Sequence, residues 1–283
     1  MKDAMTTSQS VPPAERPADG VPAISVDGLA LRAGKHTIFE DVTFDVPAGS
    51  LAVLTGPSGT GKSALALAVA GRLTPTAGRV SVLGLALPRY AGAVRRRVGV
   101  TGNATVTPLD GTLPVKHHVA EALKLAGPWW KPSASPGRVD RTITAANDLL
   151  GALEGVVGDG GTATSLVRAR LHRSELVRDA APGARFALGL VLALASDPDI
   201  LVVDDVDQLR TVHERRAAWA ALLTLGRTRD DARPLTVVAT CQDRQELDDV
   251  LDAGHRLAAL PLRPVTVHAL IPSSEPTPAP EIR

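Results

Sequence analysis

The chain has 283 residues and a mass of 29.4 kDa, with 44% of its residues hydrophobic and 22% charged. This composition supplies a core for one large α/β domain or two small ones, and it excludes wholesale disorder. The 31 lysine and arginine residues balance 30 aspartate and glutamate residues, so the net charge of +1 gives no support to a nucleic-acid partner.

The two ends of the chain are predicted to be disordered tails, and the residues between them to form one domain. Residues 1–21 and 272–283 are rich in proline and small polar residues, whereas residues 22–271 alternate apolar and polar segments. The first tail has no apolar stretch typical of a secretory signal, and the longest apolar run, Phe186–Ala195, is about half the length that a membrane-spanning helix needs. The one cysteine, Cys241, excludes an intramolecular disulfide and suits a reducing compartment. We therefore expect a cytoplasmic protein.

Short strand-like segments open the predicted domain. They cover Ala23–Val26, Leu29–Arg32 and Thr43–Val46, and a turn at residues 47–50 follows them. A further apolar strand, Leu51–Thr55, then leads into a glycine-rich turn and a helix that ends near Leu73.

The glycine-rich turn predicts a phosphate-binding loop. It matches the pattern G-x-x-x-x-G-K-[ST] at every specified position, and it lies between a strand and a helix, where such a match is meaningful. Glycine adopts backbone conformations that other residues avoid, so successive N–H groups can surround a phosphate, and the helix N-terminus adds its positive dipole end. The residues predicted to bind nucleotide are Gly56, Pro57, Ser58, Gly59, Thr60, Gly61, Lys62 and Ser63.

Two side chains of this loop have separate expected roles. Lys62 is expected to reach the β- and γ-phosphates as a point charge, and the hydroxyl of Ser63 to ligate Mg²⁺. The expected ligand is therefore a purine nucleotide with magnesium. The alternative is a glycine-rich turn without a ligand, which leaves the Lys-Ser pair in register after a buried strand without a purpose.

The next candidate for a buried strand, Arg97–Thr101, is followed by a different kind of sequence. Residues from about 104 to 180 resemble helices joined by glycine- and proline-rich loops, with no clear strand, and the predicted helices include Val115–Leu125 and Arg141–Leu153. This pattern predicts a helical subdomain inserted between two strands of a sheet.

Two acids end the following strand. The apolar run Ile200–Asp204 predicts a buried strand, and Asp205 comes directly after it. Asp204 is expected to hold Mg²⁺ through its water shell, and Asp205 to face the attacking water as the candidate catalytic base. Acids in this position also cap helices, so the pair indicates a nucleotide site only in combination with the phosphate loop.

The rest of the chain continues the alternation of strands and helices. Leu235–Thr240 predicts a strand, and helical periodicity fits Ala184–Ala195, His213–Leu225 and Arg244–Leu251. The buried strands are apolar on both sides of the alternation, as central parallel strands tend to be. The sequence therefore predicts an α/β protein with a parallel sheet covered by helices on both faces.

The order of these motifs resembles the ATP-binding cassette family, the nucleotide-binding subunits of ABC transporters. Residues 39–49, FEDVTFDVPAG, precede the phosphate loop as a similar stretch does in the family. Residues 74–84, TPTAGRVSVLG, follow it, and residues 193–205, ALASDPDILVVDD, mirror the family's strand with its acids. The resemblance covers roughly residues 22–260. It implies a P-loop NTPase fold: a parallel sheet, an N-terminal antiparallel β-subdomain and the inserted helical subdomain.

The resemblance also implies a function. We expect an ATP-binding or ATPase subunit of a transporter, with ATP and Mg²⁺ as its cofactors. The expected partners are a membrane-spanning transporter subunit and a second ATP-binding subunit, in a homodimer or a heterodimer. Such partners would hold this cytoplasmic chain at the inner face of the cell membrane.

Several family positions are altered, which identifies the chain as a degenerate member. Ala33 stands where the family stacks an aromatic ring on adenine. Asn103 stands at the family's glutamine, a contact of magnesium and water, so the resemblance implies a metal-binding and catalytic role for Asn103 on a shorter arm. Asp205 aligns with the glutamate general base, again on a shorter arm, which is expected to misplace the water.

Two further segments depart from the family. Residues Ala180–Ala184 align with its signature LSGGQ, but Ala181 lacks the signature hydroxyl and Pro182 has no N–H to donate. Cys241 replaces the switch histidine and is expected to pack as an inert apolar group. These changes predict slow hydrolysis. Two alternatives remain: an ATP-dependent regulatory or scaffold protein with little turnover, and another P-loop NTPase such as a small-molecule kinase.

Overall fold

The computed structural model describes residues 21–127, 134–157, 170–225, 233–257 and 263–270. Apart from Val21, the two predicted tails lie outside these residues. None of the helices in these ranges combines the length and the apolar composition needed to cross a membrane.

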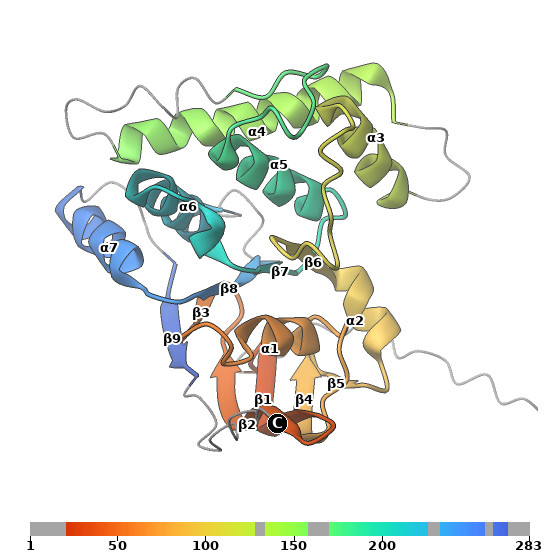
Figure 1. Ribbon diagram of the computed structural model, residues 1–283, viewed down its shortest axis with the longest axis vertical. Helices are drawn as coiled ribbons and strands as arrows, with labels where there is room; N and C mark the ends of the chain where they lie inside the picture. The colour runs from red at the N-terminus through yellow and green to blue at the C-terminus, as the bar shows by residue number, and fades with distance from the viewer. Residues whose placement is uncertain (1–20, 128–133, 158–169, 226–232, 258–262, 271–283) are drawn as a thin grey trace, which may run out of the picture.

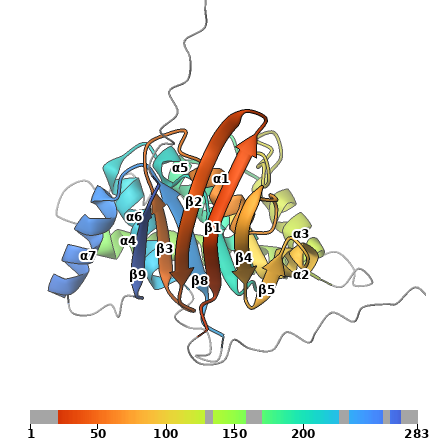
Figure 2. The ribbon, with the colours of Figure 1, turned by 90° about the horizontal axis from the view of Figure 1, so that it is seen from below.

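The described residues form two sheets, and the first of these is antiparallel and contains four strands. Its spatial order is β2-β1-β4-β5, and each strand pairs with its neighbours in antiparallel register, as Figure 2 shows from below. A two-residue turn, Gly34-Lys35, joins the first two strands, with Gly34 at a φ of 62°. This sheet confirms the antiparallel β-subdomain that the resemblance implies. Its strands are β1 (Ile24–Ala33), β2 (His36–Val46), β4 (Ala77–Val82) and β5 (Leu85–Leu87).

The second sheet is parallel and, within the described ranges, contains five strands in the order β6-β7-β8-β3-β9. The strands are β3 (Leu51–Thr55), β6 (Val98–Thr101), β7 (Ile200–Val203), β8 (Thr236–Cys241) and β9 (Val265–Ala269). Four of them match predicted strands closely, whereas β9 is an edge strand that the sequence analysis did not predict. In a parallel sheet the carboxyl ends of the strands meet at one edge, so β3 and β7 deliver the phosphate loop and the two acids to the same edge.

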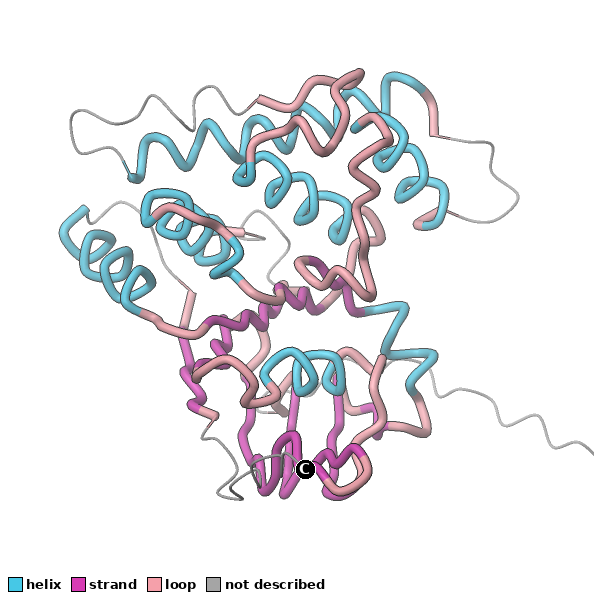
Figure 3. The backbone as a smooth tube through the Cα atoms, in the orientation of Figure 1, coloured by secondary structure: helices cyan, strands magenta, loops and turns pink. Residues whose placement is uncertain are grey.

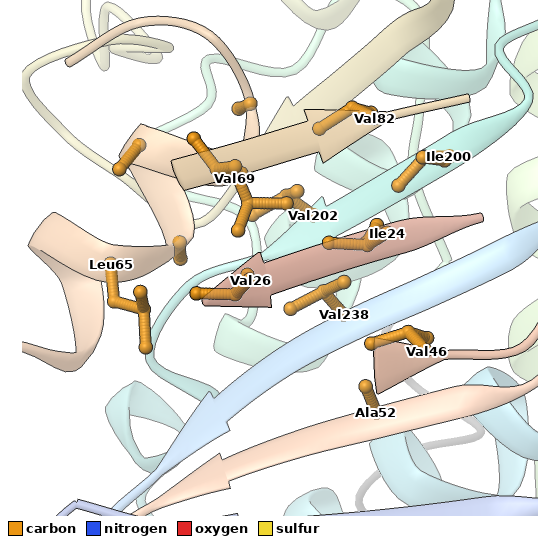
Figure 4. Close-up of a cluster of buried hydrophobic side chains, with 14 of the residues drawn as sticks. Ile24, Val26, Val46, Ala52, Leu65, Val69, Val82, Ile200, Val202 and Val238 are labelled. Carbon is orange, nitrogen blue, oxygen red and sulfur yellow. The ribbon is translucent and has the colours of Figure 1, made fainter. Parts of the chain in front are cut away.

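Both faces of the parallel sheet are buried, and alternate residues of each strand face opposite layers. Ala52, Val202 and Val238 pack against the antiparallel sheet and helix α1 (Lys62–Val69), as Figure 4 shows. Val53 and Val203 pack on the opposite side with helices α6 (Val212–Thr224) and α7 (Gln245–Leu257). This two-sided burial explains why the strands are apolar throughout, and it confirms the prediction of helices on both faces.

A group of three helices lies at the top of Figure 1, away from the antiparallel sheet. Figure 3, in which all helices are cyan, shows the same group in the same orientation. It comprises α3 (Val115–Leu125), α4 (Pro136–Val157) and α5 (Pro182–Leu194), whose facing sides share one apolar cluster. Helix α4 also packs against α6 and so connects this group to the rest of the molecule. Helix α5 begins at Pro182, two residues before the predicted start, because proline suits the first turn of a helix. A short unpredicted helix, α2 (Ala91–Arg97), precedes β6.

Candidate functional site

The phosphate loop follows β3 in a conformation that requires its glycines. Gly56, Gly59 and Gly61 have φ values of 149°, 86° and 85°. A Cβ atom on Gly56 would lie 2.5 Å from the carbonyl oxygen of Leu270, and one on Gly61 would lie 2.9 Å from Cγ2 of Ile38. Any side chain at these two positions would therefore displace backbone or core, which explains the glycines physically.

The loop is closed by its own polar side chains. The Lys62 ammonium donates hydrogen bonds of 2.7 Å to the carbonyl oxygens of both Gly56 and Pro57. The Thr60 hydroxyl, on a residue that is 4% exposed, donates to the carbonyl of Pro57 at 2.9 Å. The lysine charge therefore lies within the loop, and among the described residues no side chain caps the first turn of helix α1, whose N–H groups stay available to an anion.

The predicted metal-binding residues meet at Asp204, immediately after β7. The Ser63 hydroxyl donates to Oδ1 of Asp204 at 2.8 Å, and the Asn103 amide donates to Oδ2 at 2.8 Å. Asp204 is 4% exposed, so its carboxylate is bound by protein donors rather than by bulk water. The structure thus gathers three residues that the sequence predicts from three separate segments.

The amide of Asn103 is oriented by its own loop. Its Oδ1 accepts hydrogen bonds of 3.1 Å from the backbone N–H groups of Thr105 and Val106, so its nitrogen faces Asp204. In this arrangement Asn103 supplies a donor to Asp204, and its oxygen ligates a metal only if the turn at residues 103–106 opens. The metal-binding and catalytic roles of Asn103 stay predictions.

Asp205 is exposed and leaves the sheet in a left-handed backbone conformation, with a φ of 56°. Although the residue is exposed, the protein around its carboxyl partly desolvates that group. This desolvation and the negative charges of Asp207 and Asp204 raise the pKa of Asp205, against the opposing effect of the Lys62 ammonium. A carboxylate with a raised pKa accepts a proton more readily, which suits the predicted catalytic base. Its catalytic role also stays a prediction.

A third acid, Asp207, belongs to the same edge of the sheet, and the sequence analysis did not assign it to the site. Its carboxylate accepts a hydrogen bond from the backbone N–H of Gln242. The pKa of Asp207 is raised, because burial and the charge of Glu246 outweigh the opposing effects of that hydrogen bond and of the Arg215 and Lys62 charges. The signal in the sequence was its position two residues after Asp205.

The end of β8 contributes Thr240 rather than Cys241. Cys241 is 1% exposed and packs with Ala239 against the α6 side of the sheet, where burial raises the pKa of its thiol to about 12. Thr240 points to the opposite face, where its hydroxyl contacts both Asp204 and Asp205. The inert packing expected of Cys241 agrees with this burial. Thr240 was missed because the resemblance drew attention to the next position, although the period of two along a strand separates the two side chains.

The signature segment is not part of this cluster. Ala180–Ala184 lies at the start of α5, and Ala181 stands at the N-cap of that helix without a side-chain hydrogen bond. No hydrogen bond between described residues joins this segment to residues 56–63.

The residues of the phosphate loop, together with the acids at the same edge of the parallel sheet, fit a magnesium nucleotide. The described residues contain no group of three or more His, Cys, Asp or Glu side chains that would hold a metal by themselves. A magnesium ion here would instead use the Ser63 hydroxyl, the Asp204 carboxylate and phosphate oxygens, and Mg²⁺ is commonly bound in this way. The open helix N-terminus and the enclosed lysine match the charge of a polyphosphate.

A cavity of about 840 Å³ lies beside this site, between β6, the loop that follows it, α3 and α5. Its wall combines apolar residues with four arginines and one glutamate. The apolar residue Leu125 is 79% exposed at its edge. The charged residues of the wall are Arg72, Arg95, Arg178, Arg185 and Glu121.

Comparison with known proteins identifies relatives of this arrangement. The sequence profile of the family described as ABC transporter matches residues 39–208. The chain is 28% identical to the "Nod factor export ATP-binding protein I" of Rhizobium meliloti over 83% of its own length and 63% of that protein's. The corresponding protein of Bradyrhizobium diazoefficiens is 30% identical over 81% and 65% of the two lengths. The chain therefore spans somewhat less than two thirds of these two relatives.

Solved structures share the fold. A dimeric post-hydrolysis state of an ATP-binding cassette bound to ADP and Pi superposes with a TM-score of 0.58 at 17% identity, over 79% of this chain and 90% of that one. A cassette from Clostridium perfringens, described as part of an ABC transporter complex, gives a TM-score of 0.58 at 12% identity, over 81% and 82%.

Proposed function

Because the chain belongs to the ABC transporter family, we propose that it is an ATP-binding subunit that binds MgATP at residues 56–63 and hydrolyses it slowly. The observation that carries this proposal is the hydrogen bond between Ser63 of the phosphate loop and Asp204 of the acid pair. Ser63 and Asp204 lie far apart in the sequence, and their direct contact supports the proposal that the two segments form one magnesium nucleotide site.

The residues divide the chemistry among them. Lys62 and the N–H groups of the loop hold the charge of the β- and γ-phosphates, and a bound magnesium ion supplies further neutralisation of that charge. Asp205 accepts a proton from the attacking water as the water oxygen bonds to the γ-phosphorus. The bond from that phosphorus to the bridging oxygen breaks, and ADP and phosphate result.

Slow turnover follows from the altered positions. Asp205 offers a carboxylate on a shorter arm than glutamate, and Ala181 and Pro182 offer neither a hydroxyl nor an N–H at the signature. A missing contact in a transition state typically costs on the order of 3 kcal/mol, although such losses do not add. An ATP-dependent regulatory protein with little turnover is the second candidate, and the same signature residues favour it.

The cavity beside β6 is the surface that we assign to a membrane-spanning partner. Residues 46–109 contain no aspartate or glutamate. An acidic partner for a basic residue of this segment therefore has to come from another part of the chain or from another protein. Two of these residues, Arg72 and Arg95, lie on the cavity wall close enough for their charges to repel, and burial and this repulsion lower the pKa of Arg72. A partner segment with carboxylates between apolar side chains would relieve the repulsion and cover the exposed Leu125.

The second partner is another ATP-binding subunit. In the family, two subunits enclose nucleotides between the phosphate loop of one and the signature of the other. This chain retains the loop and lacks the signature, so a heterodimer with an intact partner signature would keep one competent site, whereas a homodimer would have two impaired ones. Sedimentation with MgATP distinguishes these states, with the variant Asp205→Asn used to trap a closed dimer.

Calorimetric titration with MgATP tests the proposed function. Lys62→Ala should weaken binding at least about tenfold, because it removes the side-chain cation of the loop and leaves the backbone in place. Lys116→Ala, on the exposed face of α3, is the matched control and should bind as the wild type does. Equal affinities for wild type and Lys62→Ala would contradict the assignment of the loop.

The partner surface needs a separate experiment. Arg95→Glu should reduce recovery of a membrane-spanning protein with the tagged chain after crosslinking in its own cells, and added salt should reduce recovery by the wild type. Arg79→Glu, an exposed arginine outside the cavity, is the control for net charge. If neither Arg95→Glu nor added salt changes the recovery of the membrane-spanning protein, this cavity is not the binding surface for the partner.

A further inference from the structure

The Thr240 hydroxyl makes two short hydrogen bonds to the neighbouring acids. It accepts the backbone N–H of Asp205 at 2.7 Å and donates to Oδ1 of Asp204 at 2.7 Å. Thr240 is 1% exposed, so no bulk water replaces either bond. One buried hydroxyl therefore holds the backbone of one acid and the carboxylate of the next.

The two hydrogen bonds occur where the ladder between β7 and β8 stops. The last paired residues of this ladder are Val203 and Ala239. The backbone N–H of Asp204 still bonds to the carbonyl of Thr101 on the β6 side, but the chain then turns away at Asp205 with a φ of 56°. The Thr240 hydroxyl takes the place of a backbone acceptor for Asp205 and fixes this left-handed turn.

Thr240 differs from the other donors to Asp204. Ser63 belongs to the phosphate loop. Asn103 belongs to the loop after β6, and its amide oxygen already accepts hydrogen bonds from backbone N–H groups of that loop. Both of these residues are expected to meet the nucleotide or its metal. Thr240 lies on β8, in the interior of the sheet, and both of its hydrogen bonds go to protein atoms of the acid pair.

We propose that Thr240 is a positioning residue for nucleotide hydrolysis, whose hydroxyl fixes the direction of the Asp205 carboxyl and one oxygen of Asp204. This inference rests on the proposed function, since it concerns the same site. Binding of the nucleotide depends on the loop at residues 56–63, so loss of the hydroxyl acts on turnover far more than on affinity.

The test compares Thr240→Val, which keeps the shape without the hydroxyl, with Thr240→Ser, which keeps the hydroxyl. Thr236→Val is the matched control. It lies on the same strand with the same 1% exposure, and its hydroxyl accepts the N–H of Gly49 at 3.0 Å, at the far end of β8 from the acids. Thermal unfolding of all three variants establishes that each one is folded.

The first measurement uses the protein without nucleotide. Amide hydrogen exchange, followed by NMR, should be at least about tenfold faster at Asp205 in Thr240→Val, because its N–H loses a buried acceptor. Exchange at Asp205 should be unchanged in Thr240→Ser and in Thr236→Val. An unchanged rate in Thr240→Val would overturn the proposal.

The second measurement follows steady-state hydrolysis of MgATP, together with the affinity for MgATP. Thr240→Val should lower kcat by about tenfold or more with KM within about threefold of the wild type, and Thr240→Ser should restore kcat. Equal losses of affinity and turnover, or a Thr240→Val variant as fast as the wild type, would overturn the positioning role and leave the proposed function intact. A wild-type chain that binds no MgATP would overturn both.

Discussion

Ser63 and Asp204 are 141 positions apart in the chain and are joined by a 2.8 Å hydrogen bond from hydroxyl to carboxylate. The bond links the start of helix α1, which follows β3, to the residue directly after β7. It therefore joins segments that follow two different strands of the parallel sheet. The Ser63 hydroxyl donates its hydrogen to the carboxylate, so the lone pairs of its oxygen stay available to the magnesium ion that is expected there. The same hydrogen bond orients those lone pairs and therefore prepares Ser63 as a metal ligand.

The expected ligation of Mg²⁺ by the Ser63 oxygen predicts a specific effect of Ser63→Ala. The variant should bind ATP in the presence of a chelator about as well as the wild type does, because the loop backbone and Lys62 are retained. It should lose most of the gain in affinity that added Mg²⁺ gives the wild type, on the order of tenfold. Calorimetry with and without Mg²⁺ measures both values. Ser58→Ala, an exposed loop position, should keep the full magnesium effect, and a similar loss there would assign the effect to the loop as a whole.

The length of the Asp205 side chain predicts opposite effects of two substitutions. Asp205→Glu should raise turnover, because the longer arm brings the carboxylate closer to the attacking water, and Asp205→Asn should abolish the turnover that remains. Single-turnover hydrolysis of labelled ATP measures both variants. Wild-type turnover of tens per second, or a rate that neither change alters, would refute the assignment of Asp205 as a short-armed base.

The end of β1 predicts weak selection of the base. Ala33, the exposed last residue of β1 beside the hairpin turn, presents no ring, so ATP and GTP should bind with similar affinity. Ala33→Tyr should raise the affinity for ATP about fivefold, which corresponds to roughly 1 kcal/mol for an aromatic stacking contact. Competition binding with ATP, GTP and inorganic triphosphate measures this gain. Ala33→Leu controls for added apolar surface, and an equal gain with leucine would exclude stacking.

A buried ion pair at the opposite end of β7 predicts a pH-dependent stability. Asp199 is 9% exposed and accepts hydrogen bonds from Arg97 at 2.6 Å and from Arg233 at 2.8 Å. Burial alone would raise the pKa of Asp199, but the two arginines outweigh it and the pKa is lowered. Asp199→Asn should lower the free energy of unfolding at pH 7 by about 3 kcal/mol, because it leaves a partly buried arginine without its counter-charge.

The sign of this pKa shift fixes the pH window. A carboxyl with a lowered pKa in the folded state stabilises the protein above its unfolded pKa, and this contribution is lost as the pH falls through the folded value. The difference between wild type and Asp199→Asn should therefore be constant near neutral pH and shrink below about pH 4. Urea unfolding at several pH values measures it. Asp197→Asn, whose side chain is 67% exposed, should change the unfolding free energy little. A difference that grows on acidification would contradict the ion-pair account.

The sequence predicted the elements that carry a strong pattern, and it missed those that do not. Leu51–Thr55 and Val115–Leu125 have the predicted bounds, because a buried strand before a glycine turn and an amphipathic helix are both distinctive. Strand β9 pairs on one side only and is half-buried, so it lacks the apolar run of a central strand. Helix α2 buries only Val94 among its seven residues, so it shows no apolar stripe.

The site followed the same rule. Motif spacing placed the phosphate loop and Asp204, since both follow central strands. The hydrogen bonds that orient these residues depend on side chains at other strand ends, and no local pattern specifies which one will face the site. Two contacts could be predicted only from the pairing register of β6, β7 and β8. They are the hydrogen bond from Asn103 to Asp204 and the one from Thr240 to Asp204.

The contact between Gly56 and Leu270 gives the final strand a part in the order of assembly. Strand β9 pairs with β3 along its whole length, and the N–H of Leu270 bonds to the carbonyl of Thr55 at 2.8 Å, one residue before the phosphate loop. A ribosome releases the loop long before it releases residue 270. The first turn of the loop therefore acquires this backbone neighbour only after residues 57–270 have been synthesised, and a nascent chain that ends before β9 lacks the strand edge that the turn contacts.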